Sequence, residues 1–398
     1  TLFRGIVHRR LKEKEIEVRP EFFMIDMTNK CNLRCNYCLR NLEQEENCIS
    51  TEKLRDIGKF ITTYCDEYKI ANISVQAWGG EPLLEKNKII ALTKFITPQK
   101  TKVHYSIETN ATLLTNDVIE ELYKNHIGIG ISIDGDRKCH DLQRTFVSGK
   151  GSYDTVKKNL LQAQRYYKNK IGTIITITKQ TAVHIEKIIE HLVLDLHISN
   201  IKLNFVHAST YTHGQNQCLN TQEIADTELR ILYKIIELQE RGYDVMEHNI
   251  FIKLKNLLFR EYADICLSCG CCGGEKMIVF DMDGNIYPCE LTDDASFVIG
   301  SIYKKESLIE QIKMTIDKDK AFFKMKKAVE CEKCYWKFFC RGGCTVRALS
   351  EKRQMEVIDI DHIECAINQV LYPALMELVL RKPHIVNQML GEDLLVDE

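Results

Sequence analysis

Six short runs rich in β-branched and aromatic residues alternate with helical segments along the first half of the chain. Each run is separated from the next by a stretch with the length and apolar spacing of a helix. That order is typical of parallel strands joined by crossover helices. We predict strands at residues 21–28, 72–80, 103–110, 128–135, 172–179 and 199–206. The pattern therefore predicts an α/β fold built on a parallel sheet.

Two of the intervening segments carry helix-start signals. Ser50 precedes a helix predicted at residues 51–68, and Thr115 opens another at residues 115–125. Six βα units close only part of an eight-unit barrel, so we expect a partial (β/α)6 TIM barrel. Active sites in such barrels lie at the C-terminal ends of the strands. A lateral opening there would admit a large substrate such as a peptide.

The composition changes after a helical stretch near residues 221–242. From Cys266 onward the chain is rich in Cys and Gly, and it contains a predicted hairpin at residues 276–289. We therefore predict a partial barrel followed by a Cys-rich C-terminal domain. The predicted segments are an N-terminal lead at 1–20, the barrel at 21–210, a helical linker at 211–265, the Cys-rich domain at 266–370 and a helical tail at 371–398.

Charge and hydropathy narrow the class of protein. The net charge is −2, with 54 basic and 56 acidic residues, which gives no reason to expect a nucleic-acid partner. The sequence has neither a signal-type apolar core nor a run of about 18 apolar residues, so we predict a cytoplasmic protein without a membrane partner. A reducing cytosol disfavours a disulfide framework for the 17 cysteines and favours metal binding.

The first cysteine group follows the first predicted strand. Cys31, Cys35 and Cys38 are spaced Cys-x3-Cys-x2-Cys on a loop. A structural zinc site normally uses four ligands, and a ferredoxin-type cluster also uses four cysteines. Three thiolates without a nearby fourth therefore predict an iron–sulfur cluster in which one iron is open to another ligand.

This spacing is identified as that of the radical S-adenosylmethionine (SAM) superfamily, which the chain resembles. The resemblance implies a four-iron four-sulfur cluster on the three cysteines, with the amino and carboxylate groups of SAM bound to the open iron. One-electron reduction of SAM would then give a 5′-deoxyadenosyl radical. The protein's share of this chemistry is ligation, orientation and shielding from water.

Further strings at successive strand ends resemble the same superfamily. The string Gly79-Gly80-Glu81-Pro82 resembles a motif whose glycines let the backbone approach the methionine amino group, from which Glu81 would accept. Arg144 has a planar donor fork suited to the SAM carboxylate. Taken singly, a Gly-Gly pair can be only a turn, and an Arg only a surface charge. The resemblance implies a SAM site made by Tyr37, Gly79, Gly80, Glu81, Glu108, Asn110, Ser132, Asp134 and Arg144.

The second cysteine group resembles the SPASM extension of enzymes that modify peptides and proteins. That extension carries two auxiliary four-iron four-sulfur clusters, so the resemblance implies three clusters in all. The outer auxiliary cluster would be bound by Cys331, Cys334, Cys340 and Cys365, and the inner one by Cys289 and Cys344 together with Cys271 and Cys266. Zinc remains the alternative for the run from Cys331 to Cys344, because thiols two residues apart are common zinc ligands.

The sequence offers more thiols than the inner cluster needs. Cys266, Cys269, Cys271 and Cys272 offer four thiols for at most two positions. We favour Cys271, which precedes Cys289 by 18 residues as the cysteine does in peptide-thioether maturases, and then Cys266. If only one ligates, the inner cluster also has an open iron. The cysteines outside these groups that we expect to be small buried hydrophobes are Cys48, Cys65, Cys139 and Cys218.

Glu290 directly follows Cys289, where anaerobic sulfatase-maturating enzymes carry an aspartate thought to act as a base. A role as an ordinary turn residue is the alternative. Our first hypothesis is a maturase that crosslinks a ribosomally made peptide, for example through a thioether. The second is a sulfatase maturase that makes formylglycine, and the third is a non-catalytic iron–sulfur or zinc scaffold. The partners implied are a peptide or protein substrate, with or without a leader sequence, and an electron donor such as flavodoxin or ferredoxin.

Overall fold

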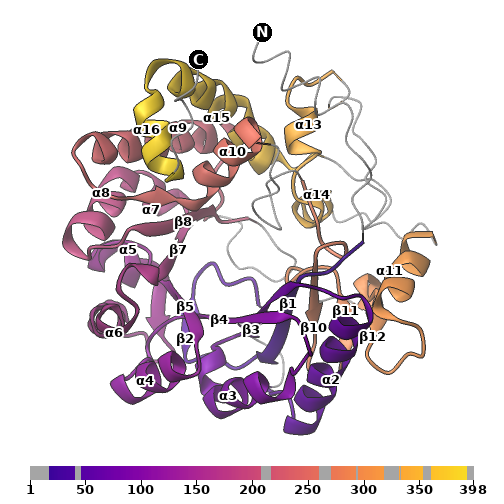
Figure 1. Cartoon of the computed structure of the whole chain (residues 1–398). Helices are drawn as coiled ribbons and strands as arrows, with labels where there is room; N and C mark the ends of the chain where they lie inside the picture. The colour runs from indigo at the N-terminus through magenta and orange to yellow at the C-terminus, as the bar shows by residue number, and fades with distance from the viewer. Residues whose placement is uncertain are drawn as a thin grey trace.

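The computed structural model describes residues 18–40, 46–207, 217–259, 270–292, 295–317, 331, 333–352 and 360–391. Within these residues the main element is a sheet in the order β12-β11-β10-β1-β3-β4-β5-β7-β8-β9. The neighbouring pairs from β10 through β1 to β9 are parallel. Figure 1 shows the strands curving around the centre of the molecule, with helices on the outside. This arrangement confirms the predicted α/β partial barrel.

The six predicted strands all form, each within a few residues of its predicted bounds. They are β1 (Phe22–Thr28), β3 (Asn72–Gly79), β4 (Lys102–Thr109), β5 (Ile127–Ser132), β7 (Gly172–Ile177) and β8 (Asn200–Phe205). A short strand that we did not predict, β9 (Met246–Glu247), extends the sheet beyond β8. A separate two-stranded ribbon is formed by β2 (Leu33–Cys35) and β6 (Arg144–Phe146).

The helices between the strands cover the outer face of the sheet. They are α2 (Thr51–Glu67), α3 (Lys86–Phe95), α4 (Asn116–Lys124), α5 (Arg137–Gln143), α6 (Tyr153–Tyr167), α7 (Lys179–Ala182) and α8 (Ile185–Glu190), with short turns η1 (Pro82–Glu85), η2 (Lys168–Lys170) and η3 (His191–Asp195). Ser50 caps α2 by accepting from the backbone N–H of Lys53, as predicted. Thr115 occupies the cap position of α4, but its side chain makes no capping hydrogen bond, so that part of the prediction is wrong.

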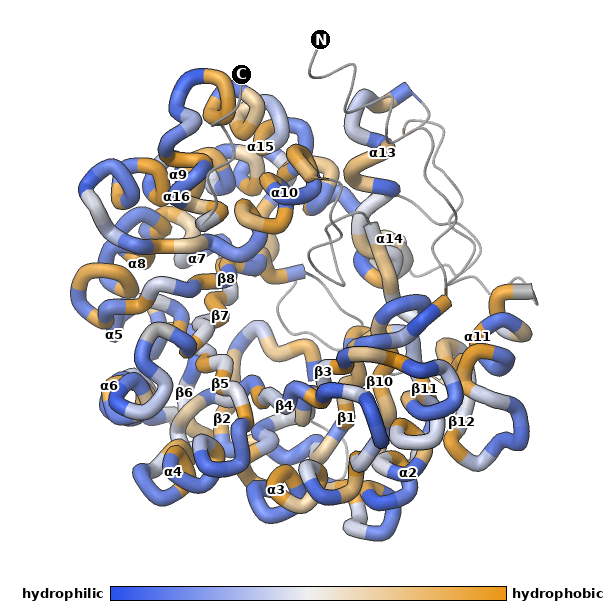
Figure 2. Tube along the Cα trace, in the orientation of Figure 1, coloured by the Kyte–Doolittle hydropathy of each residue, from blue (hydrophilic) through white to orange (hydrophobic). Residues whose placement is uncertain are grey.

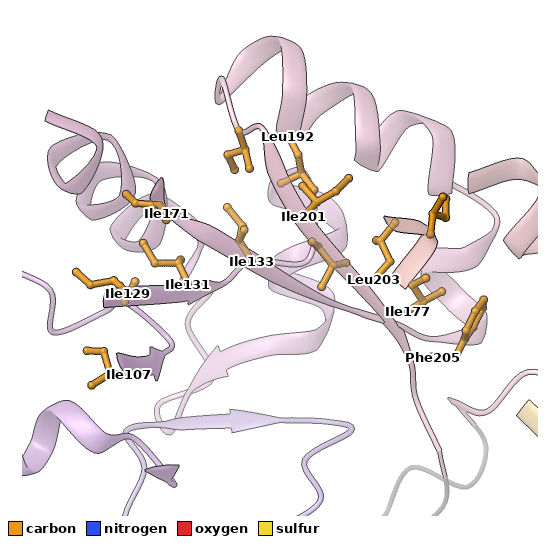
Figure 3. Close-up of a cluster of buried hydrophobic side chains, with 14 of the residues drawn as sticks. Ile107, Ile129, Ile131, Ile133, Ile171, Ile177, Leu192, Ile201, Leu203 and Phe205 are labelled. Carbon is orange, nitrogen blue, oxygen red and sulfur yellow. The ribbon is translucent and has the colours of Figure 1, made fainter. Parts of the chain in front are cut away.

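Successive residues of a strand point to opposite faces of the sheet, so each face is made by every second residue. In β5, Ile127, Ile129 and Ile131 are buried, whereas the residues between them are half-buried. Figure 3 shows Ile129 and Ile131 in an apolar layer with Ile201, Leu203 and other side chains. Along the outer helices, hydrophobic and hydrophilic stretches alternate, as expected for helices with one buried face (Figure 2). The strand residues that alternate with this buried layer point to the inner face of the barrel.

The C-terminal part of the chain continues the barrel's own sheet. Strand β10 (Met277–Phe280) pairs in parallel with β1, and β11 (Asn285–Tyr287) pairs antiparallel with β10, which confirms the predicted hairpin. Strand β12 (Gly300–Ser301) completes that edge. The remaining elements are α9 (Thr221–Glu240), α10 (His248–Phe259), η5 (Ala295–Phe297), α11 (Leu308–Asp317), α13 (Lys337–Cys340), α14 (Thr345–Lys352), α15 (His362–Arg381) and α16 (Pro383–Leu390).

Helix α15 runs through residue 370, where we expected the C-terminal tail to begin. It packs against α9, α10 and α16. By length and composition it could cross a membrane, but half of its most apolar window is buried inside the molecule. Packing within the fold therefore accounts for half of this window.

Candidate functional site

The loop that follows β1 brings three thiols to the C-terminal end of the parallel strands. The pairing of Cys35 with Arg144 joins β2 to β6 and fixes this loop against the strand-end residues. Asn110, just after β4, donates its Nδ2 to Cys31 Sγ at 3.8 Å, and Arg144 donates Nη1 to Cys35 Sγ at 3.9 Å. The backbone N–H of Leu33 donates to Cys31 Sγ at 3.5 Å. Sulfur in this loop is thus surrounded by donors that favour the thiolate form.

Burial opposes ionisation of these cysteines. It raises the pKa of the Cys31 thiol, and it raises that of Cys35 to about 12 despite the nearby Arg144 guanidinium. The neighbouring thiols, including Cys38, raise these pKa values further. Buried thiolates that repel one another need a cationic partner, and a metal centre supplies one. The donor set therefore fits an iron–sulfur cluster.

A single metal ion sets a different geometric requirement from a cluster. Among the residues that the structure describes, no three His, Cys, Asp or Glu side chains are close enough to hold a single ion. A four-iron cluster instead spreads its thiolate ligands over separate iron atoms.

The glycines of the Gly79-Gly80 pair are needed for close packing against the cysteine loop. A Cβ on Gly80 would lie 2.2 Å from the carbonyl oxygen of Lys30, and one on Gly79, whose φ is +141°, would lie 2.3 Å from that of Thr28. Gly80 N–H donates to Thr28 O at 2.7 Å, and Glu81 N–H donates to Lys30 O at 2.8 Å. The pair therefore lets the end of β3 hold the loop directly, a role distinct from the predicted approach to SAM.

Glu81 is fully buried and joins the ends of two strands. Its carboxylate accepts from Leu83 N at 3.0 Å, from Thr109 Oγ1 at 2.7 Å and from Asn110 N at 2.8 Å. Burial raises its pKa, and these hydrogen bonds oppose the rise. Asn110, held in this way, is the residue whose amide reaches Cys31. The structure thus gives Glu81 a positioning role at the cysteine loop, and contact with SAM stays a prediction.

Asp134 holds two other predicted site residues, Tyr37 and Arg144, around its buried carboxylate. Its Oδ2 accepts from Tyr37 Oη at 2.6 Å, from Arg144 Nε at 2.8 Å and from Gln143 Nε2 at 3.0 Å. Its Oδ1 accepts from Thr176 N at 2.9 Å. The Arg144 guanidinium also lies 5.3 Å from the centre of the Tyr37 ring. Tyr37, Asp134 and Arg144 are therefore brought together beside Cys35, as the sequence predicts.

Two polar residues, His140 and Ser152, connect Asp134 to the backbone of Arg144. His140 accepts from Asp134 N at its Nδ1 at 3.2 Å, and its Nε2 lies 2.9 Å from Ser152 Oγ. Ser152 in turn donates to Arg144 O at 2.7 Å. Burial lowers the pKa of His140 to about 4, so the ring is neutral at neutral pH. Ser152 was not found from the sequence. His140 opens the string His140-Asp141-Leu142-Gln143-Arg144, which the resemblance implies to lie, with Ser132-Ile133-Asp134-Gly135, near the ribose and carboxylate of SAM.

The remaining predicted residues on the barrel strands lie elsewhere along the inner face. Ser132 ends β5 and pairs with Ile174 of β7. Glu108 lies opposite Gly130 in the register, where a Cβ on the glycine would be 3.3 Å from Glu108 Cγ. Burial raises the pKa of Glu108, Lys202 and Gln76 oppose the rise, and Glu290 adds to it. Glu108 thus shares the barrel interior with Glu290.

Three of the predicted inner-cluster cysteines are packed together against the barrel. Cys271, Cys289 and Cys344 belong to one buried group that includes Met24 of β1 and Trp78 of β3. Burial raises the pKa of Cys271 and raises that of Cys344 to about 12. Cys272 is also buried but lies outside this group. The fourth predicted ligand, Cys266, and the alternative Cys269 lie outside the described residues.

The predicted outer-cluster cysteines gather at the start of α15. The pKa of Cys365 is raised by burial and then by Cys334 and Cys331 nearby. Gln369, one turn along the helix, donates Nε2 to Cys334 Sγ at 3.6 Å. Cys340 ends α13, and burial followed by Glu364 raises its pKa to about 12. Four separate points of the sequence therefore converge here.

Of the four cysteines expected to be small buried hydrophobes, two are buried and two are not. Cys65 and Cys139 are buried, which confirms the prediction for them. Cys48 and Cys218 are only half-buried, so the prediction is wrong there. Lys88 donates Nζ to Cys48 Sγ at 3.3 Å, an interaction available to a thiol near the surface.

Comparison with known proteins agrees with this arrangement. Residues 25–192 match the radical SAM superfamily. The chain is 26% identical over 327 residues to a cysteine-type anaerobic sulfatase-maturating enzyme of Clostridium novyi (strain NT), covering 80% of this chain and 85% of that protein.

Two kinds of solved structure share the fold. Native anSMEcpe with bound AdoMet and Cp18Cys peptide matches with a TM-score of 0.77 and 21% identity, covering 91% of this chain and 99% of that one. Streptococcus suis SuiB bound to precursor peptide SuiA matches with a TM-score of 0.62 and 17% identity, covering 90% and 79%. Both likenesses extend well beyond the barrel residues.

Proposed function

We propose that this chain, whose residues 25–192 match the radical SAM superfamily, is a radical SAM enzyme that modifies a peptide or protein substrate by hydrogen abstraction. When bound, a reduced four-iron cluster on Cys31, Cys35 and Cys38 together with SAM supplies a 5′-deoxyadenosyl radical. The thiols, their N–H donors and Arg144 fit such a group, because each favours negative charge on sulfur.

The residues around Asp134 would hold the cosubstrate. Tyr37 offers an aromatic face and Arg144 a guanidinium, and Asp134 fixes both from a fully buried position. One Nη of Arg144 already reaches Cys35, so the same group can face both the sulfur and a carboxylate of SAM. Asn110 and Glu81 would hold the cysteine loop from the opposite strand end.

The observation that carries the proposal is the packing of Cys271, Cys289 and Cys344 against Met24 and Trp78. If these cysteines hold the inner cluster, that cluster would lie against the face of β1 and β3 that carries Met24 and Trp78, in the same barrel whose strand ends hold the Cys31 loop. A substrate in the barrel would then lie between two cysteine groups. That arrangement suits a reaction in which a substrate radical formed on one side loses an electron to a cluster on the other side.

Glu290 is the proposed proton acceptor for this second step. Its Oε2 is buried and has no hydrogen-bond partner among the described residues. Glu290 lies near enough to Glu108 to add to the raised pKa of Glu108. An unpartnered carboxylate oxygen next to Cys289 is placed to take the proton that a substrate releases on oxidation.

We propose peptide crosslinking, for example through a thioether, as the reaction. The cysteines at 266–272 exceed what the inner cluster needs, and of the two that the structure describes, Cys271 packs with Cys289 and Cys344. If the inner cluster has only three protein ligands, its open iron could bind a substrate thiolate. A leader-bearing peptide, a flavodoxin or ferredoxin as electron donor, two auxiliary clusters and a cytoplasmic location complete the proposal.

Formylglycine formation on a sulfatase is the second candidate. It is favoured by the 26% identity to the Clostridium novyi enzyme over 80% of this chain, and by the higher TM-score to anSMEcpe than to SuiB. Mass spectrometry of the products separates the two candidates. A thioether crosslink keeps the substrate sulfur, whereas formylglycine made from cysteine loses it.

The radical reaction is tested with anaerobically reconstituted protein. We expect about twelve irons per chain if three four-iron clusters form. The variant Cys31→Ala, Cys35→Ala, Cys38→Ala should lose about four of them and all cleavage of SAM to 5′-deoxyadenosine. The matched control is Cys48→Ala, Cys65→Ala, Cys139→Ala, which removes three cysteines outside the predicted ligand groups and should keep both. Failure of the intact protein to make 5′-deoxyadenosine would instead support a non-catalytic scaffold.

Glu290→Gln tests the base separately. We expect it to keep cleavage of SAM and cluster content while the yield of oxidised peptide falls about 100-fold, within the usual contribution of a general base. An unchanged product yield would leave Glu290 as a turn residue.

A further inference from the structure

Four buried charged side chains form a connected network among the helices that carry the auxiliary cysteines. Asp361 and Glu364 come from the start of α15, Arg347 from α14 and Lys253 from α10. Asp361 is fully buried, and the side chain of Arg347 is 11% exposed. Buried charges cost free energy unless they are paired and hydrogen-bonded. A complete network at this position therefore calls for a reason.

Asp361 holds the segments of two predicted ligands with a single carboxylate. Its Oδ2 accepts from the backbone N–H of Cys344 at 2.8 Å. Its Oδ1 accepts from Glu364 N at 3.2 Å and so caps the helix that bears Cys365. The backbone N–H of Cys365 also donates to Asp361 O at 2.8 Å. One residue thus contacts an inner-cluster cysteine and the helix turn of an outer-cluster cysteine.

Arg347 closes the same connection from the other side. It lies three residues after Cys344 and donates Nε to Asp361 Oδ2 at 2.9 Å and Nη2 to the same oxygen at 2.5 Å. Its Nη2 also lies 3.4 Å from Glu364 Oε2. The bend before Cys344 requires Gly343, whose φ is +76° and whose Cβ would lie 2.7 Å from Asp361 Oδ2. The loop is thus shaped to bring Cys344 onto this carboxylate.

Lys253 ties the network to α10, the helix that follows β9 of the barrel sheet. It donates Nζ to Glu364 Oε1 and, at 2.7 Å, to Asn368 Oδ1. Asn368 returns a hydrogen bond to Glu364 Oε1 at 3.0 Å. Glu364 of α15 is thus bonded to Lys253 of α10 and lies beside Arg347 of α14, so the network fixes these helices relative to one another.

We propose that Asp361 and Arg347 form a clamp that positions the inner-cluster cysteine Cys344 and the outer-cluster cysteine Cys365 in one frame, so that the two auxiliary clusters are assembled together. The clamp acts through the backbone of both ligand segments, which makes Asp361 and Arg347 positioning residues. This inference rests on the two auxiliary clusters of the proposed function, but it concerns their assembly and makes no use of the substrate.

The test compares iron content and cluster spectra of reconstituted variants. Asp361→Asn keeps the size of the side chain but replaces the carboxylate with an amide, whose N–H group faces N–H donors. Arg347→Met removes the guanidinium group. Arg347→Lys retains the charge without the two-point contact. The control is Lys234→Met, because the Lys234 side chain is also 11% exposed and ion-paired, with Glu190, on helices remote in sequence from the clamp. Electron paramagnetic resonance of the reduced proteins, with and without SAM, distinguishes the SAM-site cluster from the auxiliary ones.

We expect Asp361→Asn and Arg347→Met to drop from about twelve irons to about four, with the SAM-responsive signal kept, and Lys234→Met to keep all. Arg347→Lys should retain an intermediate amount. The clamp is wrong if both variants keep all their auxiliary iron, if they lose one auxiliary cluster alone, or if the SAM-site signal disappears with the rest. If the intact protein holds only about four irons, it has no auxiliary clusters for the clamp to position. If it holds about twelve irons but makes no peptide product, only the proposed reaction is contradicted.

Discussion

The Cys31 loop and the C-terminal cysteines are held by different kinds of structure. The Cys31 loop lies on the ends of parallel strands, and the groups that reach its sulfurs, Asn110 and Arg144, come from residues at or just after strand ends. The C-terminal cysteines lie on loops and helices, where a buried charge network joins Cys344 to the turn of Cys365.

The difference shows two ways of fixing ligands before a metal arrives. A parallel sheet fixes its strand ends through its backbone ladder, so the first loop needs mainly room for close approach, which glycines provide. Loops between helices have no such ladder. They need side-chain contacts, and charge-assisted hydrogen bonds are the strong ones. Each solution has its own weak point, and variants can expose them one at a time.

Two glycine substitutions should have the largest and most selective effects. Gly80→Ala would put a Cβ 2.2 Å from Lys30 O, so we expect loss of about four irons at the SAM site with the auxiliary iron kept. Gly343→Ala would strain a left-handed residue and press on Asp361, so we expect the reverse, with about eight auxiliary irons lost. Iron analysis and the SAM-responsive resonance signal check both.

The controls for these substitutions separate the effect of a steric clash at the new Cβ from the effect of a positive φ. Gly172→Ala has no atom within 4 Å of the new Cβ and an ordinary φ, so it controls for Gly80→Ala. Gly149→Ala has the same open space but a φ of +82°, so it controls for the strain at Gly343. Loss of iron from both regions in either site variant would contradict separate fixation of the two regions.

Glu228 should make the C-terminal region sensitive to alkali. It lines a small cavity of about 30 Å³ with Lys253, Arg347 and Glu364. Burial raises its pKa from 4.5 to about 8, with Glu247 and Glu364 adding to the rise and Lys253 opposing it. The unfolded chain releases this proton near pH 4.5, so its stabilising contribution is complete below pH 4.5 and is lost as the pH rises toward 8.

The Glu228→Gln variant removes that titration. We expect it to be more stable than the parent by roughly 3 kcal/mol at pH 7 and about 5 kcal/mol above pH 8, with little difference near pH 4.5. Unfolding of the anaerobic holoprotein across this pH range measures it. Parallel pH profiles for the two proteins would show that Glu228 does not bind its proton more tightly in the folded state.

His140 should give the Cys31 region the opposite sensitivity. Burial lowers its pKa from 6.5 to about 4. Between these pH values His140 is protonated in the unfolded chain and neutral in the folded chain. The stabilising contribution is therefore complete above pH 6.5 and is lost as the pH falls toward 4, by about 3 kcal/mol in total. Between pH 4.5 and 6.5 His140 and Glu228 act on stability in opposite directions, so His140→Gln should lose stability with rising pH more steeply than the parent, whereas Glu228→Gln should gain it. Equal slopes in His140→Gln and its parent would refute this.

The fold could be predicted in most of its parts from local sequence. Strand alternation located all six barrel strands, and the hairpin at 276–289 was visible from its own turn residues. The pairing of β10 with β1 was not predicted, because it joins segments more than 250 residues apart without a local signal. The missing hydrogen bond at Thr115 is a similar case, since a side chain's rotamer depends on its surroundings.

The candidate site likewise contains residues that could be predicted from the sequence and residues that could not. Tyr37, Asp134 and Arg144 were found because each lies in or beside a recognisable string, and the structure joins them. Lys253 and Glu364 were not found, because they are 111 residues apart and each looks like an ordinary helix charge in sequence. A charge reveals such a role only when its burial and its partner are known.

Removal of a helix cap should have the smallest effect on stability. It also tests the difference between the Cys31 loop and the C-terminal cysteines. Ser50 and Asp361 both cap a helix through the N–H three residues on, at 3.1 Å for Ser50 and 3.2 Å for Asp361. Ser50 is exposed and does nothing else for a ligand segment in the described structure, so Ser50→Ala should cost about 1 kcal/mol of stability without changing iron content. Asp361→Ala should cost several times more, because it also leaves Arg347 buried without its partner. Denaturant unfolding of both variants measures the ratio, and equal losses would mean that Asp361 is only a cap, with the charge network adding nothing to the C-terminal region.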